Sequence, residues 1–283
     1  MTLTGSRLRL APKAQTPKDT AQRATSEETT SPSSEGLLRS TSQLSDVIPA
    51  YSQQEVFFCP EESHFYSHCL ERLVFNRYRD SSSIIEFGSG DGSPVINALM
   101  RSQFNGAIHG YELNPSAYQV ARARAAQCEL DQKYIVHNRS FFDADAPNAD
   151  CLIANPPYLP APDNNICMPL LHGGSDGATI TNKLLTLDCP NVMVLISSYS
   201  NPVETIEHGL DHGYAVADFM LTPLQFGYYS SEPKVLNTIR ELREKNMAFY
   251  SKNIYLLAGV LFKKQHKCQV DLSTELIQIM TSL

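Results

Sequence analysis

The feature that most constrains the fold is a regular alternation of short apolar runs with helix-like segments. The segment at 115–130 is the clearest predicted helix, because Asn114 can cap it and Pro115 suits its first turn. Strands that alternate with helices predict βαβ units and a mainly parallel α/β sheet. The first five apolar runs are Ile84–Phe87, Ala107–Tyr111, Tyr134–Val136, Cys151–Ala154 and Val192–Ile196.

The pattern extends at both ends of this region. Residues 61–78 predict an amphipathic helix before the first run, with apolar side chains recurring on one face. After the fifth run, Tyr214–Met220 and Ile254–Phe262 predict two further strands, and 233–248 predicts a helix between them. We therefore expect seven strands with helices packed against the sheet.

Composition changes along the chain and suggests where its domains begin and end. Residues 1–45 are rich in Ser, Thr, Glu and Pro, and their low apolar content cannot offset the entropy of ordering, which predicts a disordered tail. A helical lead-in is expected at 46–82, the main domain at 83–265 and a C-terminal extension at 266–283. Within the main domain, 222–253 is a long insertion that could act as a lid over a pocket.

Charge and cysteine content narrow the class of function. The net charge of −7 weighs against nucleic-acid binding, which needs a basic surface. Seven scattered cysteines without a C-x-x-C pair favour a reducing compartment such as the cytoplasm over a disulfide framework or a zinc site. The basic first half of the tail leaves organellar import as an alternative. No metal site is expected, although His64 and His68 are four residues apart, and no apolar run is long enough to span a membrane.

Three glycines directly after the first apolar run predict a ligand-binding loop. Gly88, Gly90 and Gly92 alternate with other residues, and a helix-like segment follows at 94–100. Glycine has no Cβ and tolerates unusual φ angles, so a ligand can lie against the backbone at a helix N-terminus. The acidic Asp91 inside the loop argues against a phosphate ligand.

Two acidic residues near this loop define the ligand further. Glu112 follows the second apolar run, where a carboxylate can accept hydrogen bonds from both hydroxyls of a ribose. Glu86 precedes the glycines, where it can face an α-amino group or a sulfonium. The pattern predicts a nucleoside that carries an amino acid. The alternative is an ordinary strand–turn–helix connection followed by a charged strand end.

The fourth apolar run is followed by the segment Asn155-Pro156-Pro157-Tyr158, and the chain now resembles the class I S-adenosylmethionine-dependent methyltransferases. The glycine loop, Glu112 and this segment each end a predicted strand, which is where ligands bind in an open α/β sheet. The resemblance implies a Rossmann-like seven-stranded sheet, mostly parallel with the last strand antiparallel and helices on both faces, and S-adenosylmethionine as cofactor. The expected cofactor contacts are Glu86, Phe87, Gly88, Ser89, Gly90, Gly92, Glu112, Leu113, Ser140, Phe141 and Asn155.

The chemistry of methyl transfer explains the residue types of the N-P-P-Y segment. A planar nitrogen delocalises its lone pair, which must be aimed at the methyl group before it can react. The Asn155 side-chain oxygen and the Pro156 carbonyl can each accept a hydrogen bond from a planar NH2 group, and so favour its pyramidalisation. We expect Asn155, Pro156 and Tyr158 to be catalytic. The expected substrate contacts are Pro157, Tyr158, Phe226 and Tyr228.

A second resemblance narrows the family. Leu171–Gly177 looks like the G-G-x-D-G segment of the HemK-type protein-(glutamine-N5) methyltransferases, and Val56–Ser63 loosely resembles the segment before their catalytic domain. In this superfamily the N-P-P-Y segment marks enzymes that methylate glutamine side chains, adenine amines or sometimes guanine. The likeness covers about residues 55–220.

The chain departs from that family in ways that bear on its substrate. HemK-type release-factor enzymes carry a helical N-terminal domain that docks their protein substrate, and the low-complexity residues before the match cannot form it. Asn138-Arg139 stands where a Gly-Asp pair is usual, and Ser197–Pro202 lacks the expected acidic residue. These departures favour a small molecule, a free amino acid or a short peptide over a release factor.

We therefore expect an N-methyltransferase that acts on a planar nitrogen, an amide or an amine, of a small molecule, an amino acid or a protein side chain. Two alternatives stay open: a nucleic-acid adenine-N6 methyltransferase, and a non-catalytic binding subunit with the same fold. The net charge argues against the first alternative, and the intact Asn155 argues against the second. The sequence leaves the oligomeric state open.

Overall fold

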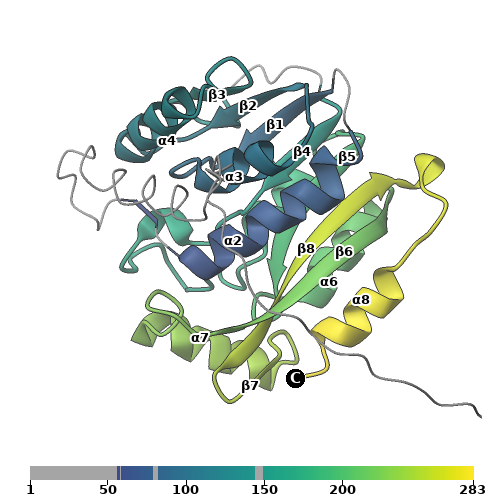
Figure 1. Ribbon diagram of the computed structural model, residues 1–283. Helices are drawn as coiled ribbons and strands as arrows, with labels where there is room; N and C mark the ends of the chain where they lie inside the picture. The colour runs from purple at the N-terminus through teal and green to yellow at the C-terminus, as the bar shows by residue number, and fades with distance from the viewer. Residues whose placement is uncertain (1–55, 58, 79–81, 144–148) are drawn as a thin grey trace, which may run out of the picture. The chain divides into compact units, whose positions relative to one another are not determined.

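The computed structural model describes residues 56–57, 59–78, 82–143 and 149–283. The tail predicted at 1–45 lies outside these residues. The part of the chain that is described contains one sheet with the strand order β3-β2-β1-β4-β5-β8-β6, and β7 pairs with β8 (Figure 1). The strands are β1 Ser83–Phe87, β2 Ala107–Tyr111, β3 Tyr134–His137, β4 Cys151–Ala154, β5 Asn191–Ser197, β6 Tyr214–Gln225, β7 Tyr250–Ser251 and β8 Ile254–Lys264.

The strand directions confirm the predicted fold class. The pairs β1–β2, β1–β4, β2–β3 and β4–β5 are parallel. The last strand, β8, runs antiparallel to both β5 and β6, between which it lies. The seven expected strands are present, and the two-residue β7 adds an eighth at the edge of β8.

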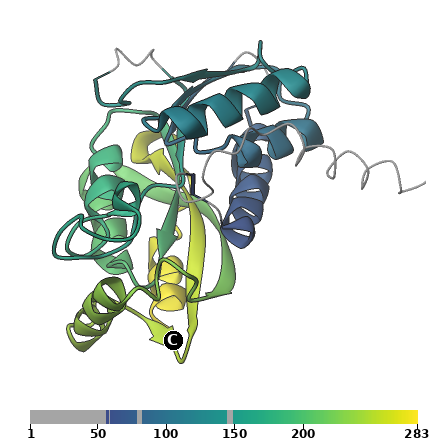
Figure 2. The ribbon, with the colours of Figure 1, turned by 90° about the vertical axis from the view of Figure 1, so that its left-hand side faces the viewer.

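Helices cover both faces of the sheet, as expected. The α-helices are α2 Pro60–Cys69, α3 Ser93–Arg101, α4 Pro115–Gln127, α5 Thr179–Leu185, α6 Pro202–Asp211, α7 Pro233–Glu244 and α8 Ser273–Met280, and a π-helical segment, Leu70–Phe75, continues α2. Helices α2, α3 and α4 pack together on one face, and α5, α6 and α8 pack together on the other. Figure 2 shows α2 (blue) and α6 (green) on opposite sides of the sheet.

Alternation along each strand divides the core between the two faces. Ile84 belongs to one buried cluster with α2 and α3, whereas Ile85 belongs to a second cluster with α5, α6 and α8. Ile153 and Leu152 divide in the same way. Because both faces of the central strands are covered, these strands are apolar throughout rather than alternately polar.

Two predicted helices end earlier than their apolar periodicity suggests. The segment expected at 115–130 is helical to Gln127, and Glu129 then takes a φ of 58°. The segment expected at 233–248 is helical to Glu244, and Asn246 takes a φ of 59°. A residue in the left-handed region commonly ends a helix, and apolar spacing alone does not reveal it. The Asn114 cap is present, since its side chain accepts a hydrogen bond from Ser116 N at 2.9 Å.

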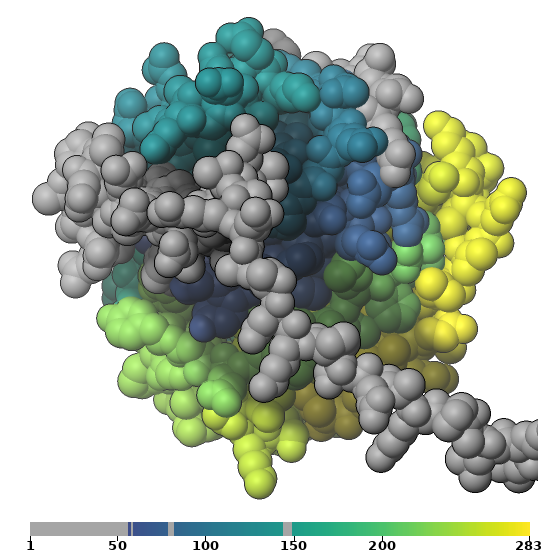
Figure 3. Space-filling view, viewed as in Figure 1, coloured from purple at the N-terminus to yellow at the C-terminus, as the bar shows by residue number. Residues whose placement is uncertain are grey.

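The insertion at 222–253 begins as the end of β6 and continues through a turn to α7 and β7. Two buried side chains of α7, Val235 and Ile239, join the cluster that contains Tyr158. Lys234 Nζ also donates to Asp163 Oδ1 at 2.8 Å, which ties α7 to the loop after β4. In the space-filling view, α4 (teal) lies along the upper edge of this face and the lime-green residues of the insertion along the lower edge (Figure 3).

Candidate active site

The glycine loop lies at the carboxyl end of β1. Gly88 and Gly90 have φ values of 70° and 54°, and a Cβ added to either would meet no atom within 4 Å. Their bare backbone therefore faces open space that a ligand can use. Gly92, with a φ of 73°, has another role, because its Cβ would lie 3.0 Å from the Cβ of Ala121 and would separate α3 from α4.

Glu112 braces this loop from the end of β2. One carboxylate oxygen accepts a hydrogen bond from Gly90 N at 2.7 Å, and the other accepts one from Asn114 N at 2.7 Å. The side chain is only 8% exposed, and burial raises the pKa of the carboxyl while these N–H donors oppose that rise. Each carboxylate oxygen retains a further lone pair that can accept a ribose hydroxyl.

Glu86 lies behind the loop rather than on its open side. Its carboxylate is 1% exposed and accepts hydrogen bonds from the Tyr134 hydroxyl at 2.6 Å and the Tyr66 hydroxyl at 3.5 Å. Burial raises the pKa of Glu86 to about 7, against the lowering effect of Tyr134. Ser89 is buried beside it, in space that a Cβ on Gly110 would fill. The contact with an α-amino group stays a prediction, and the observed contacts give Glu86 a supporting position.

The remaining predicted cofactor residues surround the ends of β1, β2 and β3. Leu113, directly after Glu112, is 57% exposed. Phe87 and Phe141 contact each other edge to face, with ring centroids 5.6 Å apart, and Ser140 beside Phe141 is half-buried. Asn138 Nδ2 donates to the backbone oxygen of Glu112 at 2.9 Å, so it ties the end of β3 to that of β2.

The N-P-P-Y segment leaves the end of β4, whose four residues are all buried. Asn155 is the first residue after the strand, and its Oδ1 is buried with no hydrogen-bond partner in the described part of the chain. A buried amide oxygen without a partner costs free energy, which a ligand with an N–H donor would offset. Pro156 is buried and Pro157 half-buried behind it.

The G-G-S-D-G segment packs against the back of the N-P-P-Y loop. A Cβ on Gly173 would lie 2.7 Å from Tyr158 Cα, so only glycine permits this approach. Ser200 Oγ donates to the Tyr158 carbonyl at 2.7 Å. Asp176 Oδ2 accepts a hydrogen bond from Asn201 Nδ2 at 2.8 Å. The serine-rich segment after β5, where the sequence lacks the expected acid, therefore holds the acceptor loop in place.

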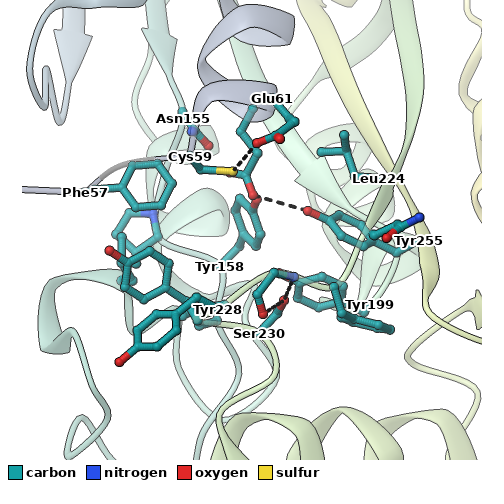
Figure 4. A pocket seen from close by; sticks show the side chains of 18 of the residues that line it. Phe57, Cys59, Glu61, Asn155, Tyr158, Tyr199, Leu224, Tyr228, Ser230 and Tyr255 are labelled. Atoms are coloured by element: carbon teal, nitrogen blue, oxygen red, sulfur yellow. Dashed lines mark hydrogen bonds between the residues drawn. The ribbon is translucent and has the colours of Figure 1, made fainter.

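A cavity of about 570 Å³ opens beside the N-P-P-Y loop (Figure 4). Its walls come from the start of α2, the loop after β4, the segment after β5, the end of β6 and the turn that follows, and β8. Every residue from 223 to 230 lines it. The aromatic lining residues are Phe57, Tyr158, Tyr199, Phe226, Tyr228, Tyr229 and Tyr255.

The structure brings the four predicted substrate residues, Pro157, Tyr158, Phe226 and Tyr228, to this one cavity. The Phe226 ring packs against Tyr199 at 5.4 Å between centroids, and Tyr158 also packs against Tyr199, at 5.8 Å. Tyr228 is 77% exposed and stays free to contact a ligand. Of the predicted cofactor residues, Asn155 alone is among the described residues that line the cavity, so it joins the two halves of the site.

Glu62 is the charged and buried residue among those lining this cavity that the sequence analysis did not identify, and Tyr199 and Tyr255 were missed with it. It is 8% exposed and accepts a hydrogen bond from the Tyr255 hydroxyl at 3.2 Å. Burial raises the pKa of the Glu62 carboxyl, while the hydrogen bond from the Tyr255 hydroxyl opposes that rise. A signal existed: Glu62 precedes Phe65 and Cys69 at helical spacing, on the buried face of α2.

The described residues contain neither a cluster of metal ligands nor a membrane-spanning helix. In residues 56–57, 59–78, 82–143 and 149–283, no three His, Cys, Asp or Glu side chains are grouped as a metal site would need. His64 and His68 contact each other, with their Nε2 atoms 3.1 Å apart. In the same residues, no helix has the length and apolar character needed to cross a membrane.

Comparison with known proteins finds relatives that are named as glutamine methyltransferases. No model of a protein family matches the chain. The release factor glutamine methyltransferase of Agrobacterium fabrum is 24% identical over half of this chain and 53% of its own length. A Methanocaldococcus jannaschii protein, provisionally assigned as a protein N5-glutamine methyltransferase, is 28% identical over 52% of this chain and 76% of its own length. The chain thus spans about half the length of the first of these relatives.

Among solved structures, a Pyrococcus horikoshii protein, provisionally assigned as an RNA methyltransferase, matches with a TM-score of 0.52 and 13% identity. The match covers 78% of this chain and 94% of that protein. At this identity the likeness concerns the fold alone. The chain therefore has the fold of a class I S-adenosylmethionine-dependent methyltransferase, and its sequence is similar to the HemK-type protein-glutamine methyltransferases.

Proposed function

We propose that this protein is an S-adenosylmethionine-dependent N-methyltransferase that acts on a planar amide or amine nitrogen. The observation that carries this proposal is the buried Asn155 Oδ1, which has no hydrogen-bond partner in the described residues and belongs to a side chain that lines the aromatic cavity. The similarity to enzymes named for glutamine methylation supports the same chemistry.

The residues at the ends of β1 and β2 fit the cofactor. Open space beside Gly88 and Gly90 would admit the amino-acid part against the backbone. Glu112 would bind the ribose, and the exposed Leu113 with Phe141 would lie near the adenine. When bound, S-adenosylmethionine supplies a methyl group on a positively charged sulfur. The supporting position of Glu86 keeps the loop in a shape that leaves this space open.

The residues of the acceptor loop would prepare the nitrogen. Asn155 Oδ1 and the Pro156 carbonyl would accept the two N–H bonds of the acceptor group and orient its lone pair. As positive charge develops on the nitrogen, both oxygens interact with it more strongly, which stabilises the transition state. The Tyr158 ring forms one wall of the cavity and would position the planar group. The proton leaves after transfer, so no strong general base is needed.

The acceptor belongs to a small molecule, a free amino acid or a protein side chain. As part of this proposal, the insertion at 222–253 acts as a lid, because its first turn lines the cavity while α7 is tied to the loop after β4. The seven cysteines are free thiols, which supports a reducing compartment such as the cytoplasm.

Calorimetry with S-adenosylhomocysteine tests the cofactor half of the proposal. We expect binding to the wild-type protein and loss of binding in Gly90→Arg, which fills the open side of the loop. Transfer of a labelled methyl group in a cell extract tests the other half, with wild type and Asn155→Ala compared. Equal labelling by both proteins would identify Asn155 as non-catalytic and would favour a binding subunit.

A further inference from the structure

The acceptor cavity contains a buried acid without a basic partner. Glu62 is 8% exposed, and its carboxyl accepts a hydrogen bond from the neutral Tyr255 hydroxyl. In the described part of the chain, no lysine, arginine or histidine lines the cavity. A buried carboxyl without a counter-charge is costly, so a ligand that brings N–H donors or a positive charge would bind favourably.

The walls of the cavity favour the same ligands. Aromatic rings attract cations to their faces and provide flat surfaces for planar groups. Tyr158, Tyr199 and Tyr255 form one aromatic group beside Glu62. The Tyr255 hydroxyl donates to the Glu62 carboxyl, Tyr199 packs against Tyr255 with ring centroids 4.7 Å apart, and Tyr158 packs against Tyr199 at 5.8 Å. An anionic ligand such as a phosphate or carboxylate would find an acid and no cation here, and would be excluded.

Asn155 supplies the second acceptor atom of the cavity. Its Oδ1 is buried and has no hydrogen-bond partner in the described residues, and Asn155 lines the same cavity as Glu62. Two hydrogen-bond acceptors, Oδ1 of Asn155 and the Glu62 carboxyl, therefore belong to one cavity.

We propose that Glu62 determines acceptor specificity, and that the acceptor is a planar, non-anionic nitrogen compound with a second N–H donor beside the methylated nitrogen. Amidines, guanidines and aminoheterocycles have this arrangement. One N–H group would face Asn155 and the second would face Glu62. This inference rests on the proposed methyl transfer, because it assigns the molecule that this reaction would modify.

Three planar probes of almost equal size test the assignment by calorimetry: benzamidine, a cation with two nitrogen donors; benzamide, its neutral analogue; and benzoate, its anion. We expect the wild-type protein to bind benzamidine at least tenfold more tightly than benzamide, and benzoate not measurably. Benzoate binding equal to that of benzamidine would overturn the proposal, as would failure of the wild-type protein to bind benzamidine.

Glu62→Gln removes the charge with little change of shape, and the preference for benzamidine over benzamide should fall to less than twofold. Glu207→Gln removes the same charge at an exposed residue of α6 that does not line the cavity and is the matched control, which should keep the preference. A preference that survives in Glu62→Gln contradicts the proposal. If this variant does not fold, the binding of the three probes to the wild-type protein still tests the proposed class of acceptor.

Titration of each sample with S-adenosylhomocysteine separates this inference from the proposed function. If the wild-type protein discriminates among the probes through Glu62 but does not bind the cofactor product, methyl transfer is wrong and the cavity assignment stands. If the product binds and the probes are not discriminated, the methyltransferase proposal stands and the role given to Glu62 is wrong.

Discussion

At the end of β1, the acidic side chains beside the glycine loop accept hydrogen bonds from the protein itself. Glu86 accepts from two tyrosine hydroxyls, and Glu112 accepts from two backbone N–H groups. At the end of β4, Asn155 Oδ1 has no partner in the described residues, and Glu62 faces a cavity without a described basic residue. The first region is preorganised by internal bonds, whereas the second leaves acceptor atoms free. This difference suggests that the loop shapes a site for one fixed ligand and that the cavity selects a ligand by its donors.

The largest effect on turnover is expected from the loss of Asn155 Oδ1, the acceptor atom without a partner in the described residues. Asn155→Ala should lower the turnover rate by about 10²–10³-fold, since one group that stabilises developing charge is lost. Methyl transfer from labelled cofactor gives the measurement, on the substrate that the extract assay identifies. Asn164→Ala, at an exposed position in the loop after the cavity, is the control for removal of an amide and should leave the rate unchanged. A fall in the turnover rate of less than threefold in Asn155→Ala would contradict the difference drawn between the glycine loop and the cavity.

The pH dependence of stability tests the burial of the Glu86 carboxyl. Its pKa is raised from 4.5 to about 7 by burial, so the folded protein favours the protonated carboxyl. The resulting stabilisation is fully present below pH 4.5 and is lost as the pH rises to about 7, by a total of about 3 kcal/mol. Urea unfolding at pH 5 and pH 8 should reveal this loss in the wild type and a smaller loss in Glu86→Gln, in which the other buried carboxyls, Glu62 and Glu112, still contribute.

Glu207→Gln, an exposed carboxyl on α6, is the control for that experiment and should keep the wild-type profile. The same variants sharpen the role of Glu86 at the cofactor. If the carboxylate contacts the α-amino group, Glu86→Gln weakens the binding of S-adenosylhomocysteine at pH 8. If it only supports the loop, affinity stays within twofold of the wild-type value.

A smaller effect is expected when a Cβ is added to a glycine with positive φ. Two such variants distinguish backbone strain from loss of a ligand contact. Gly90→Ala and Gly213→Ala both place a Cβ at positive φ, 54° and 78°, and in both cases the Cβ meets no atom within 4 Å. Each should lower the free energy of unfolding by about 1 kcal/mol. Only Gly90→Ala should also weaken S-adenosylhomocysteine binding, because Gly213 lies in the turn between α6 and β6. Equal affinities in both variants would mean that the open side of the loop is not the cofactor site.

The smallest effect is expected behind the acceptor loop. Ser200→Ala removes the hydrogen bond to the buried Tyr158 carbonyl, which should cost about 1 kcal/mol of stability. Because the loop then moves more freely, turnover should fall by a few-fold with little change in cofactor affinity. Ser231→Ala, at an exposed position in the insertion, gives the matched control. Unchanged turnover would mean that Asn155 is positioned without help from the segment after β5.

The sequence predicted those features that are determined by residues close to one another in the chain. Apolar runs revealed the strands, and Gly88, Glu112 and Asn155 each follow a strand, so the α/β topology brings them to one edge. Glu62 was not predicted, because the cavity joins α2, the loop after β4 and β8, which are far apart in the chain. The supporting position of Glu86 was missed for the same reason: Tyr66 and Tyr134, which bind its carboxylate, come from α2 and β3.

The segment that joins β6 to β8 has a consequence for how the acceptor cavity can change. The register pairs Gln225 with Ile254, so residues 226–253 leave and re-enter the sheet at adjacent points. The length of a segment closed in this way affects the entropy of folding only slowly. Exchange of this segment for one of another length or composition that keeps the buried face of α7 would remodel one cavity wall and leave the strand order and cofactor loop intact. Under the proposed function, acceptor preference would therefore diverge through this segment while the residues that follow β1 and β4 are preserved.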